Sequence, residues 1–150
     1  MIVGIGIDIV ACDRLKSWLE CGDAQLQKVF TQQELEYCRH DGELNVQALA
    51  ARFAAKEAFF KALSAVLVRL QLTNQEFSFL WACKQIEVIK GIWDEPIINV
   101  DWRAMSAGPM QADAKLLAFA GNFGGAEFQN FSEPRRHRLI PRRFRNIQRI

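Results

Sequence analysis

Two acidic side chains stand out, one in a predicted strand and one in a predicted long helix. Asp8 falls inside the alternating segment 2–10, and the interior of a strand disfavours aspartate. Glu57 falls in the middle of ALAARFAAKEAFFKAL, a run of strong helix formers. Two carboxylates from different elements can hold a hard cation such as Mg²⁺, which proteins bind through one or two carboxylates plus phosphate oxygens. The pair therefore indicates metal-assisted chemistry on a phosphate group.

Basic side chains accompany Glu57. Arg52 and Lys56 are four residues apart, as are Glu57 and Lys61, so each pair lies on one face of a helix. This face would supply positive charge to phosphates, and positioning with charge neutralisation carries most of the catalysis in phosphoryl-type transfer. The alternative is a set of solvated ion pairs on an exposed helix, with Asp8 a strand-end residue bonded to a neighbouring turn.

The segment that carries Asp8 is predicted to be a strand with two different faces. Ile5, Ile7 and Ile9 share one side, which we expect to be packed, and Gly4, Gly6 and Asp8 share the other, bare side. The two glycines allow a ligand or another backbone to come close.

Other elements complete an α+β pattern up to about residue 103. A capping box, Thr31-Gln32-Gln33-Glu34, predicts a helix from about 32 to 39, and Gly42 fits a loop behind it. A long helix is predicted from Asn45 to about residue 69. The remaining expected elements are a short helix at 13–20, strands at 85–90 and 97–101 separated by Gly91 and Pro96, and a helix at 112–120.

Composition indicates one globular domain of ordinary character. The chain has 150 residues, of which 50% are hydrophobic and 24% charged. Its four cysteines form no CxxC pair and no zinc-like spacing, which favours reduced thiols in a cytoplasmic protein. The start, MIVGIGIDIV, lacks the features of a signal peptide, and no apolar run is long enough to span a bilayer, so we expect no membrane association.

Two segments together resemble the signatures of the holo-[acyl-carrier-protein] synthase family of 4′-phosphopantetheinyl transferases. They are GIGIDIV at 4–10 and ARFAAKEAFFKAL at 51–63. VFTQQELEYC at 29–38 and KQIEVIK at 84–90, followed by Pro96, also match. The resemblance covers about residues 1–101, and the two signatures at this spacing are highly specific.

The resemblance implies an α+β phosphopantetheinyl transferase-like fold that assembles as a homotrimer. The implied reaction moves 4′-phosphopantetheine from coenzyme A to a serine of apo acyl carrier protein and releases adenosine 3′,5′-bisphosphate. It implies Mg²⁺ ligation by Asp8 and Glu57, and a place for Lys61 near the transferred phosphate. It further implies coenzyme A binding near Arg52 and Lys56, and docking of the acidic carrier protein on Arg14 and Lys16.

General chemistry agrees with these implied roles. Magnesium would offset the charge that builds on the leaving phosphate. Glu57, directly or through a metal-bound water, would take the serine proton, and Lys61 would stabilise the departing oxygen. Basic side chains on the first helix would steer an acidic partner.

The chain departs from the family in two places. The stretch after the KEA helix, SAVLVRLQLTNQEF at 64–77, has no glycine where the family has a glycine-rich turn. The family's Ser-His strand and its alternating last strand are absent as well. We therefore divide the chain into a transferase-like domain at 1–104 and an atypical tail at 105–150.

The tail is strongly basic. Its last 16 residues hold seven arginines and no acid, whereas residues 1–134 carry 12 basic and 17 acidic side chains. The seven are Arg135, Arg136, Arg138, Arg142, Arg143, Arg145 and Arg149. Residues 129–150 show no helical or strand period, which predicts a disordered segment. His137 is not preceded by serine or threonine and receives no role.

Three explanations of the tail remain open. Codons permitted for residues 130–135, read one base forward, give Ile-Ser-Val-Ser-His, and those for 142–148 permit Val-Ala-Phe-Val-Ile-Phe. Both are family tail segments in the right order, which suggests a frameshift between about 104 and 128. The second explanation is a divergent natural tail. The third, a nucleic-acid or membrane-surface arm, is disfavoured because only Phe144 accompanies the arginines.

These features leave a second function beside the transferase. A catalytically impaired relative would keep only coenzyme A or carrier-protein binding. The absent glycine turn and Ser-His strand favour that alternative, and the presence of Asp8, Glu57 and Lys61 opposes it.

Overall fold

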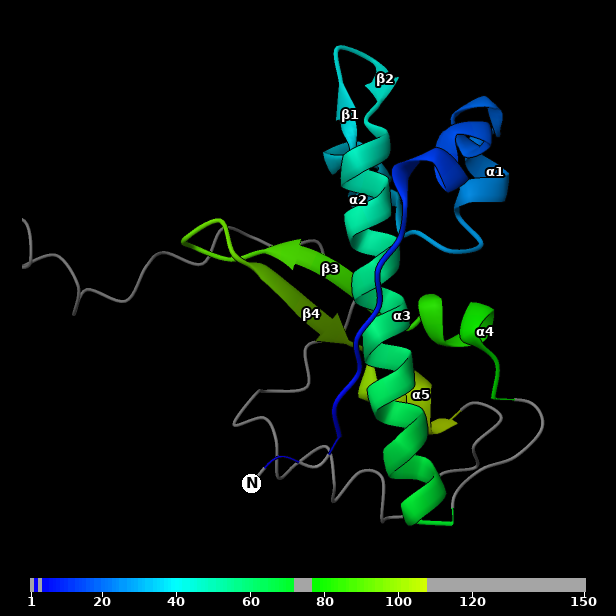
Figure 1. The fold of residues 1–150 in the computed structure, drawn as a ribbon, viewed down its shortest axis with the longest axis vertical. Coiled ribbons are helices and arrows are strands. Elements are labelled where there is room, and N and C mark those ends of the chain that lie inside the picture. Colours follow the sequence, from blue (N-terminus) through cyan, green and yellow to red (C-terminus); the bar gives the residue numbers. More distant parts are fainter. Residues whose placement is uncertain (1, 3, 72–76, 108–150) are drawn as a thin grey trace, which may run out of the picture.

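The computed structural model describes residues 2, 4–71 and 77–107. Their architecture is α+β, as predicted, and is built around one long helix (Figure 1). The elements in chain order are the 3₁₀ helix η1 (Cys12–Glu20), α1 (Asp23–Leu26), α2 (Gln32–Tyr37), β1 (Arg39–His40), β2 (Glu43–Leu44), α3 (Val46–Arg69), α4 (Phe79–Cys83), β3 (Ile86–Lys90), β4 (Pro96–Val100) and α5 (Trp102–Ala107).

The long helix α3 forms where its sequence predicts. The Asn45 side chain accepts hydrogen bonds from the backbone N–H groups of Gln47 and Ala48, which satisfies donors that have no partner inside the helix. The helix then runs without interruption to Arg69. Its position at the centre of the molecule lets it contact η1, α4 and β3.

The predicted capping box at the start of α2 is confirmed. The Thr31 side chain accepts from the Glu34 backbone N–H, and the Glu34 carboxylate accepts from the Thr31 backbone N–H at 2.8 Å. The helix ends at Tyr37, two residues before the predicted end, because the chain turns into a short β1–β2 hairpin that was not predicted. Gly42 lies in the turn with a φ of 87°, which suits glycine.

The predicted strands β3 and β4 form an antiparallel pair. Ile86 pairs with Val100 and Lys90 with Pro96, so Pro96 begins the second strand, where it disturbs the ladder least. This hairpin projects to one side of α3 (Figure 1). Helices α4 and α5 were not predicted.

The N-terminal segment differs from the prediction in two ways. It is extended along α3, but no strand among the described residues pairs with it. Its faces are also reversed, since Ile5, Ile7 and Ile9 are 71%, 74% and 88% exposed. A Cβ on Gly6 would lie 1.8 Å from the carbonyl oxygen of Ala58, so the glycine face is the one that packs. Because glycine has no side chain, the backbone of this segment can contact the backbone of α3. This contact decides which face of the segment packs against the helix.

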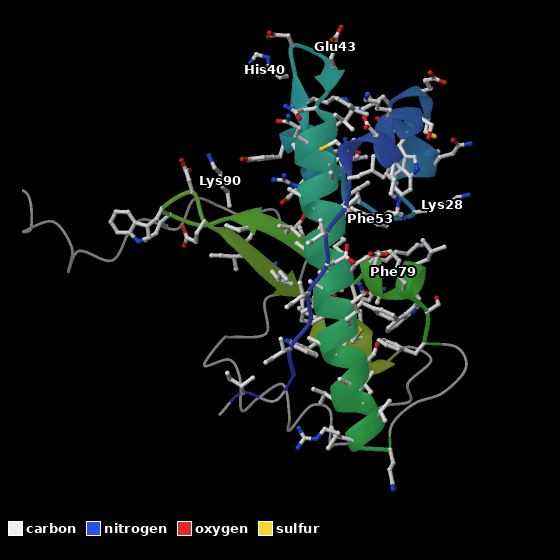
Figure 2. The ribbon with its side chains drawn as sticks, in the orientation of Figure 1. Lys28, His40, Glu43, Phe53, Phe79 and Lys90 are labelled. Carbon is white, nitrogen blue, oxygen red and sulfur yellow. The ribbon has the colours of Figure 1, made fainter. Side chains whose placement is uncertain are left out.

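Two apolar clusters hold these elements together. In the first, the rings of Phe53 on α3 and Phe79 on α4 meet edge to face at 5.5 Å (Figure 2). The second, around Leu67, Ile86 and Met105, joins α3 to β3 and α5. No helix of the described residues is both long and apolar enough to cross a membrane. The predicted helix at 112–120 and the arginine-rich segment lie outside the described residues.

Candidate active site

The acids Asp8 and Glu57 meet at the contact between the N-terminal segment and α3. The glycine face that lies on Ala58 carries Asp8 two residues after Gly6, and Glu57 is the residue before Ala58. The two carboxyl groups are close enough for each to shift the pKa of the other. Residues separated by 49 positions in sequence therefore form one acidic pair.

The side chain of Lys61 contacts the Asp8 member of this pair. Its Nζ donates to Oδ1 of Asp8 at 2.5 Å and lies 3.4 Å from the carbonyl oxygen of Ile7. The Asp8 side chain is only 9% exposed, whereas that of Lys61 is 53% exposed. The carboxylate is thus nearly buried, whereas the ammonium is half exposed to solvent.

The surroundings shift the two carboxyl pKa values in opposite directions. The hydrogen bond from Lys61 lowers the pKa of Asp8, although burial opposes this effect. Burial raises the pKa of Glu57, and the adjacent Asp8 raises it further. Asp8 is therefore held ionised, while Glu57 is the better proton acceptor of the two.

The donor set suits a hard divalent cation. Oδ2 of Asp8 is buried and makes no hydrogen bond with the described residues, so one carboxylate oxygen has no protein partner. The described residues hold no group of three or more histidine, cysteine or acidic side chains that could hold a metal ion, so a metal here would need further ligands from water or substrate. Two carboxylates with an open side fit Mg²⁺, which keeps waters and takes phosphate oxygens as further ligands.

Arg14 from η1 is close enough for its positive charge to lower the pKa of both Asp8 and Glu57. The prediction placed it on a docking face, and in the structure this exposed side chain also faces the acidic pair. Lys16 lies farther along η1, where its Nζ is 2.6 Å from Asp13 in an exposed ion pair.

Arg52 lies on another side of α3, beside a pocket of about 150 Å³ between α2 and β3. Its guanidinium covers the ring of Tyr37 at 3.8 Å, and Nη1 donates to the carbonyl oxygen of Ala48. Nε of Arg52 is buried and has no hydrogen-bond partner among the described residues.

The structure does not bring Lys56 to this site or to any surface. Its side chain is fully buried and its Nζ lies 2.7 Å from Oε2 of Glu34. The i,i+4 spacing with Arg52 suggested accessible charge, but both side chains are buried, so the exposed ion-pair alternative is wrong for this stretch. Contact between the Lys56 ammonium and coenzyme A would require it to leave these partners.

Sequence reasoning missed the importance of Glu34. The capping box identified it only as a helix-start residue, yet its other oxygen accepts from the backbone N–H of Val88 at 2.7 Å. An acid in a capping box that is followed by the apolar residue Leu35 gives no signal of a partner 54 positions away.

Comparison with known proteins assigns this arrangement to a family. A sequence model of the 4′-phosphopantetheinyl transferase superfamily matches residues 4–108. A holo-[acyl-carrier-protein] synthase of Trichlorobacter lovleyi is 50% identical over 126 residues, which cover 83% of this chain and 91% of that protein. A shorter match, 46% identical over 74 residues, covers 49% of this chain and 59% of the Treponema denticola holo-[acyl-carrier-protein] synthase.

Solved structures of this family have the same fold. The Neisseria meningitidis holo-[acyl-carrier-protein] synthase is 30% identical with a TM-score of 0.51, covering 81% of this chain and 82% of that one. A Chronobacterium ammoniagenes structure, described as a complex with CoA, is 20% identical with a TM-score of 0.50 and covers 70% and 78%. The chain belongs to the 4′-phosphopantetheinyl transferase superfamily, and it is a transferase enzyme of the holo-[acyl-carrier-protein] synthase type.

Proposed function

We propose that the chain transfers 4′-phosphopantetheine from coenzyme A to a serine of apo acyl carrier protein in an Mg²⁺-dependent reaction. The convergence of Asp8, Glu57 and Lys61 in a chain of this family carries the proposal. The serine oxygen forms a bond to the phosphorus attached to pantetheine. The phosphorus–oxygen bond to adenosine 3′,5′-bisphosphate breaks, and that molecule leaves.

Each side chain of the pair has a role that its environment supports. Glu57, whose pKa is raised by burial, accepts the serine proton directly or through a water. Asp8 stays ionised beside Lys61 and, with Glu57, would hold Mg²⁺. The ion, when bound, supplies positive charge to the pyrophosphate. Lys61, whose side chain is half exposed, donates to the departing phosphate oxygen.

The binding roles are divided between two surfaces. Arg14 and Lys16 present positive charge on the exposed face of η1 and would attract an acidic carrier protein. Arg52 lines the pocket between α2 and β3 and would bind a coenzyme A phosphate there. We do not retain Lys56 in this set because it is fully buried against Glu34.

Intact-mass measurement tests the proposed reaction. The chain is incubated with coenzyme A, Mg²⁺ and apo acyl carrier protein, and the carrier protein should gain the mass of one phosphopantetheine. A carrier protein whose target serine is replaced by alanine is the control and should gain nothing. Retained coenzyme A binding without any gain of mass would favour the impaired relative instead.

We also propose that the chain assembles as a homotrimer through the exposed isoleucine face. Ile5, Ile7 and Ile9 form an apolar row on an extended segment that has no strand partner among the described residues. An uncovered row of this kind is typical of a protein–protein contact.

Light scattering after gel filtration tests the trimer. The wild type should elute at three times the chain mass of 17.1 kDa, and Ile7→Lys should dissociate it. Ile92→Lys is the matched control, because Ile92 is 88% exposed but lies in the β3–β4 turn. A wild-type monomer at all concentrations rules the trimer out.

For residues 105–150 we propose a reading-frame shift rather than a natural extension. The arginine excess in 135–150 and the two family segments permitted in the next frame support it. The nucleotide sequence of codons 104–150 decides the question, and a gene that cannot encode Ile-Ser-Val-Ser-His in the next frame ends the idea.

The proposed cytoplasmic location is supported by four free cysteines.

A further inference from the structure

The buried ammonium of Lys56 is held from four directions. It forms an ion pair with Glu34 at 2.7 Å. It also donates to the backbone carbonyl oxygens of Val29 at 2.8 Å, Cys83 at 3.0 Å and Ile86 at 2.8 Å. These acceptors come from α2, the segment before it, the end of α4 and the start of β3. The Lys56 side chain therefore connects α3 to α2, to the segment before α2, to α4 and to β3.

The partner of Lys56 is itself fixed. Oε2 of Glu34 also accepts from the Thr31 backbone N–H, and Oε1 accepts from the Val88 backbone N–H. The Thr31 hydroxyl donates to Glu87 at 2.8 Å, which joins α2 to β3 a second time. Glu34 therefore cannot follow Lys56 if α3 turns, because its oxygens are committed to other elements.

The other side of α3 is held by contact between backbones. A Cβ on Gly4 would lie 2.7 Å from the carbonyl oxygen of Ala62, and one on Gly6 only 1.8 Å from that of Ala58. The helix therefore lies between the N-terminal segment and the anchor at Lys56. Glu57 is the residue between the anchored Lys56 and the contacted Ala58.

We propose, on the basis of the function proposed above, that Lys56 is a positioning residue that fixes the rotation of α3 so that Glu57 meets Asp8 at the metal site. The tip of a helical side chain lies about 5–6 Å from the axis, so a rotation of 20° displaces it by about 2 Å. A displacement of that size exceeds the tolerance of a binding constellation, which is about 0.5 Å. The anchor acts on the metal site without touching coenzyme A or the carrier protein.

The test measures Mn²⁺ binding by electron paramagnetic resonance, with no coenzyme A or carrier protein present. Lys56→Met removes the ammonium but leaves Glu34 charged and buried, so Lys56→Met/Glu34→Gln is made as well to keep a folded variant available. We expect the double variant to bind Mn²⁺ at least tenfold more weakly than the wild type. Its kcat for transfer should fall at least tenfold, while its KM for coenzyme A changes less than threefold.

Asn45→Ala is the matched control. It removes the cap of the same helix and lowers stability, but it leaves the Lys56 anchor intact. We expect Asn45→Ala to bind Mn²⁺ within twofold of the wild type. Equal loss of Mn²⁺ affinity in this control and in the double variant would reduce the effect to lost stability and overturn the proposal.

Two further outcomes separate this inference from the proposed function. A folded double variant that binds Mn²⁺ as tightly as the wild type overturns the positioning role, whatever the transfer assay shows. A wild type that binds Mn²⁺ but transfers nothing overturns the proposed function and leaves the positioning role standing. A wild type that binds no Mn²⁺ overturns the positioning role, and the intact-mass assay alone then decides the transfer function.

Discussion

Two lysines on α3, five residues apart, each form an ion pair with a carboxylate from another element, yet the two pairs have little else in common. The Lys56–Glu34 pair is completely buried and surrounded by backbone acceptors. In the Lys61–Asp8 pair the lysine is half exposed, and Oδ2 of Asp8 accepts no hydrogen bond from the described residues. The first pair has its partners within the described residues, and the second leaves one carboxylate oxygen available to a ligand.

This contrast assigns a structural role to one lysine of α3 and a ligand-binding role to the other. A buried charge needs every hydrogen bond satisfied, and the interior supplies those bonds to Lys56. A charge that must meet a ligand needs an open side, and Lys61 and Asp8 retain one.

Substitution of Glu57, the acid beside the Lys61–Asp8 pair, should have the largest effect on function. Glu57→Gln should lower the rate of transfer by about 10²–10⁴-fold, because the variant loses the proton acceptor and one metal ligand. Stability at neutral pH should not fall, since burial raises the pKa of Glu57 and ionisation there opposes folding. Initial rates from intact mass, with thermal unfolding in parallel, measure both. Glu36→Gln, at an exposed acid of α2, is the control.

Substitution in the buried Lys56–Glu34 pair should have the largest effect on stability. Lys56→Ala leaves the Glu34 charge buried without its partner and should lower the free energy of unfolding by about 3–5 kcal/mol. Urea unfolding followed by circular dichroism gives the value. A loss below about 1 kcal/mol would show that the interior does not depend on this ion pair.

Substitution of Lys61 should affect catalysis more than stability. Lys61→Ala removes one donor to the leaving phosphate and should reduce kcat by about 10²–10³-fold. Its unfolding midpoint should move far less than that of Lys56→Ala, because the side chain is 53% exposed. If the two lysine variants lose stability equally, the contrast between an open and a closed pair is wrong.

The smallest expected effect concerns acid stability. The hydrogen bond from Lys61 lowers the folded-state pKa of Asp8 below its ordinary value of 3.8. The pair therefore stabilises the fold above about that pH, and this contribution is lost as the pH falls through the lowered pKa. In Lys61→Gln the contribution is absent, so the difference in stability from the wild type should shrink below pH 3.8. Urea titrations at a series of pH values measure the difference.

The sequence predicts those parts of the fold that depend on local signals. The Asn45 cap and the helix formers behind it predict α3, and the capping box predicts α2. The acids of the candidate site could also be found, because Asp8 is unusual inside a strand and Glu57 lies in the second family signature, and the two lie together.

The other features of the fold depend on contacts between residues far apart in the sequence, which local sequence patterns do not reveal. The isoleucine face of segment 2–10 was expected to pack, but orientation was decided by how closely Gly6 approaches Ala58. The i,i+4 spacing of Arg52 and Lys56 suggested surface charge, and burial followed instead from Glu34 and three distant carbonyl groups. These outcomes are set by tertiary contacts.

The unequal exposure of the two lysines has a practical consequence for following unfolding. An amine-acylating reagent should modify Lys61 in the native protein, whereas Lys56 becomes reactive only when the domain opens. One proteolytic peptide spanning both would then report native accessibility and global opening together, with the first amine as an internal standard for the second.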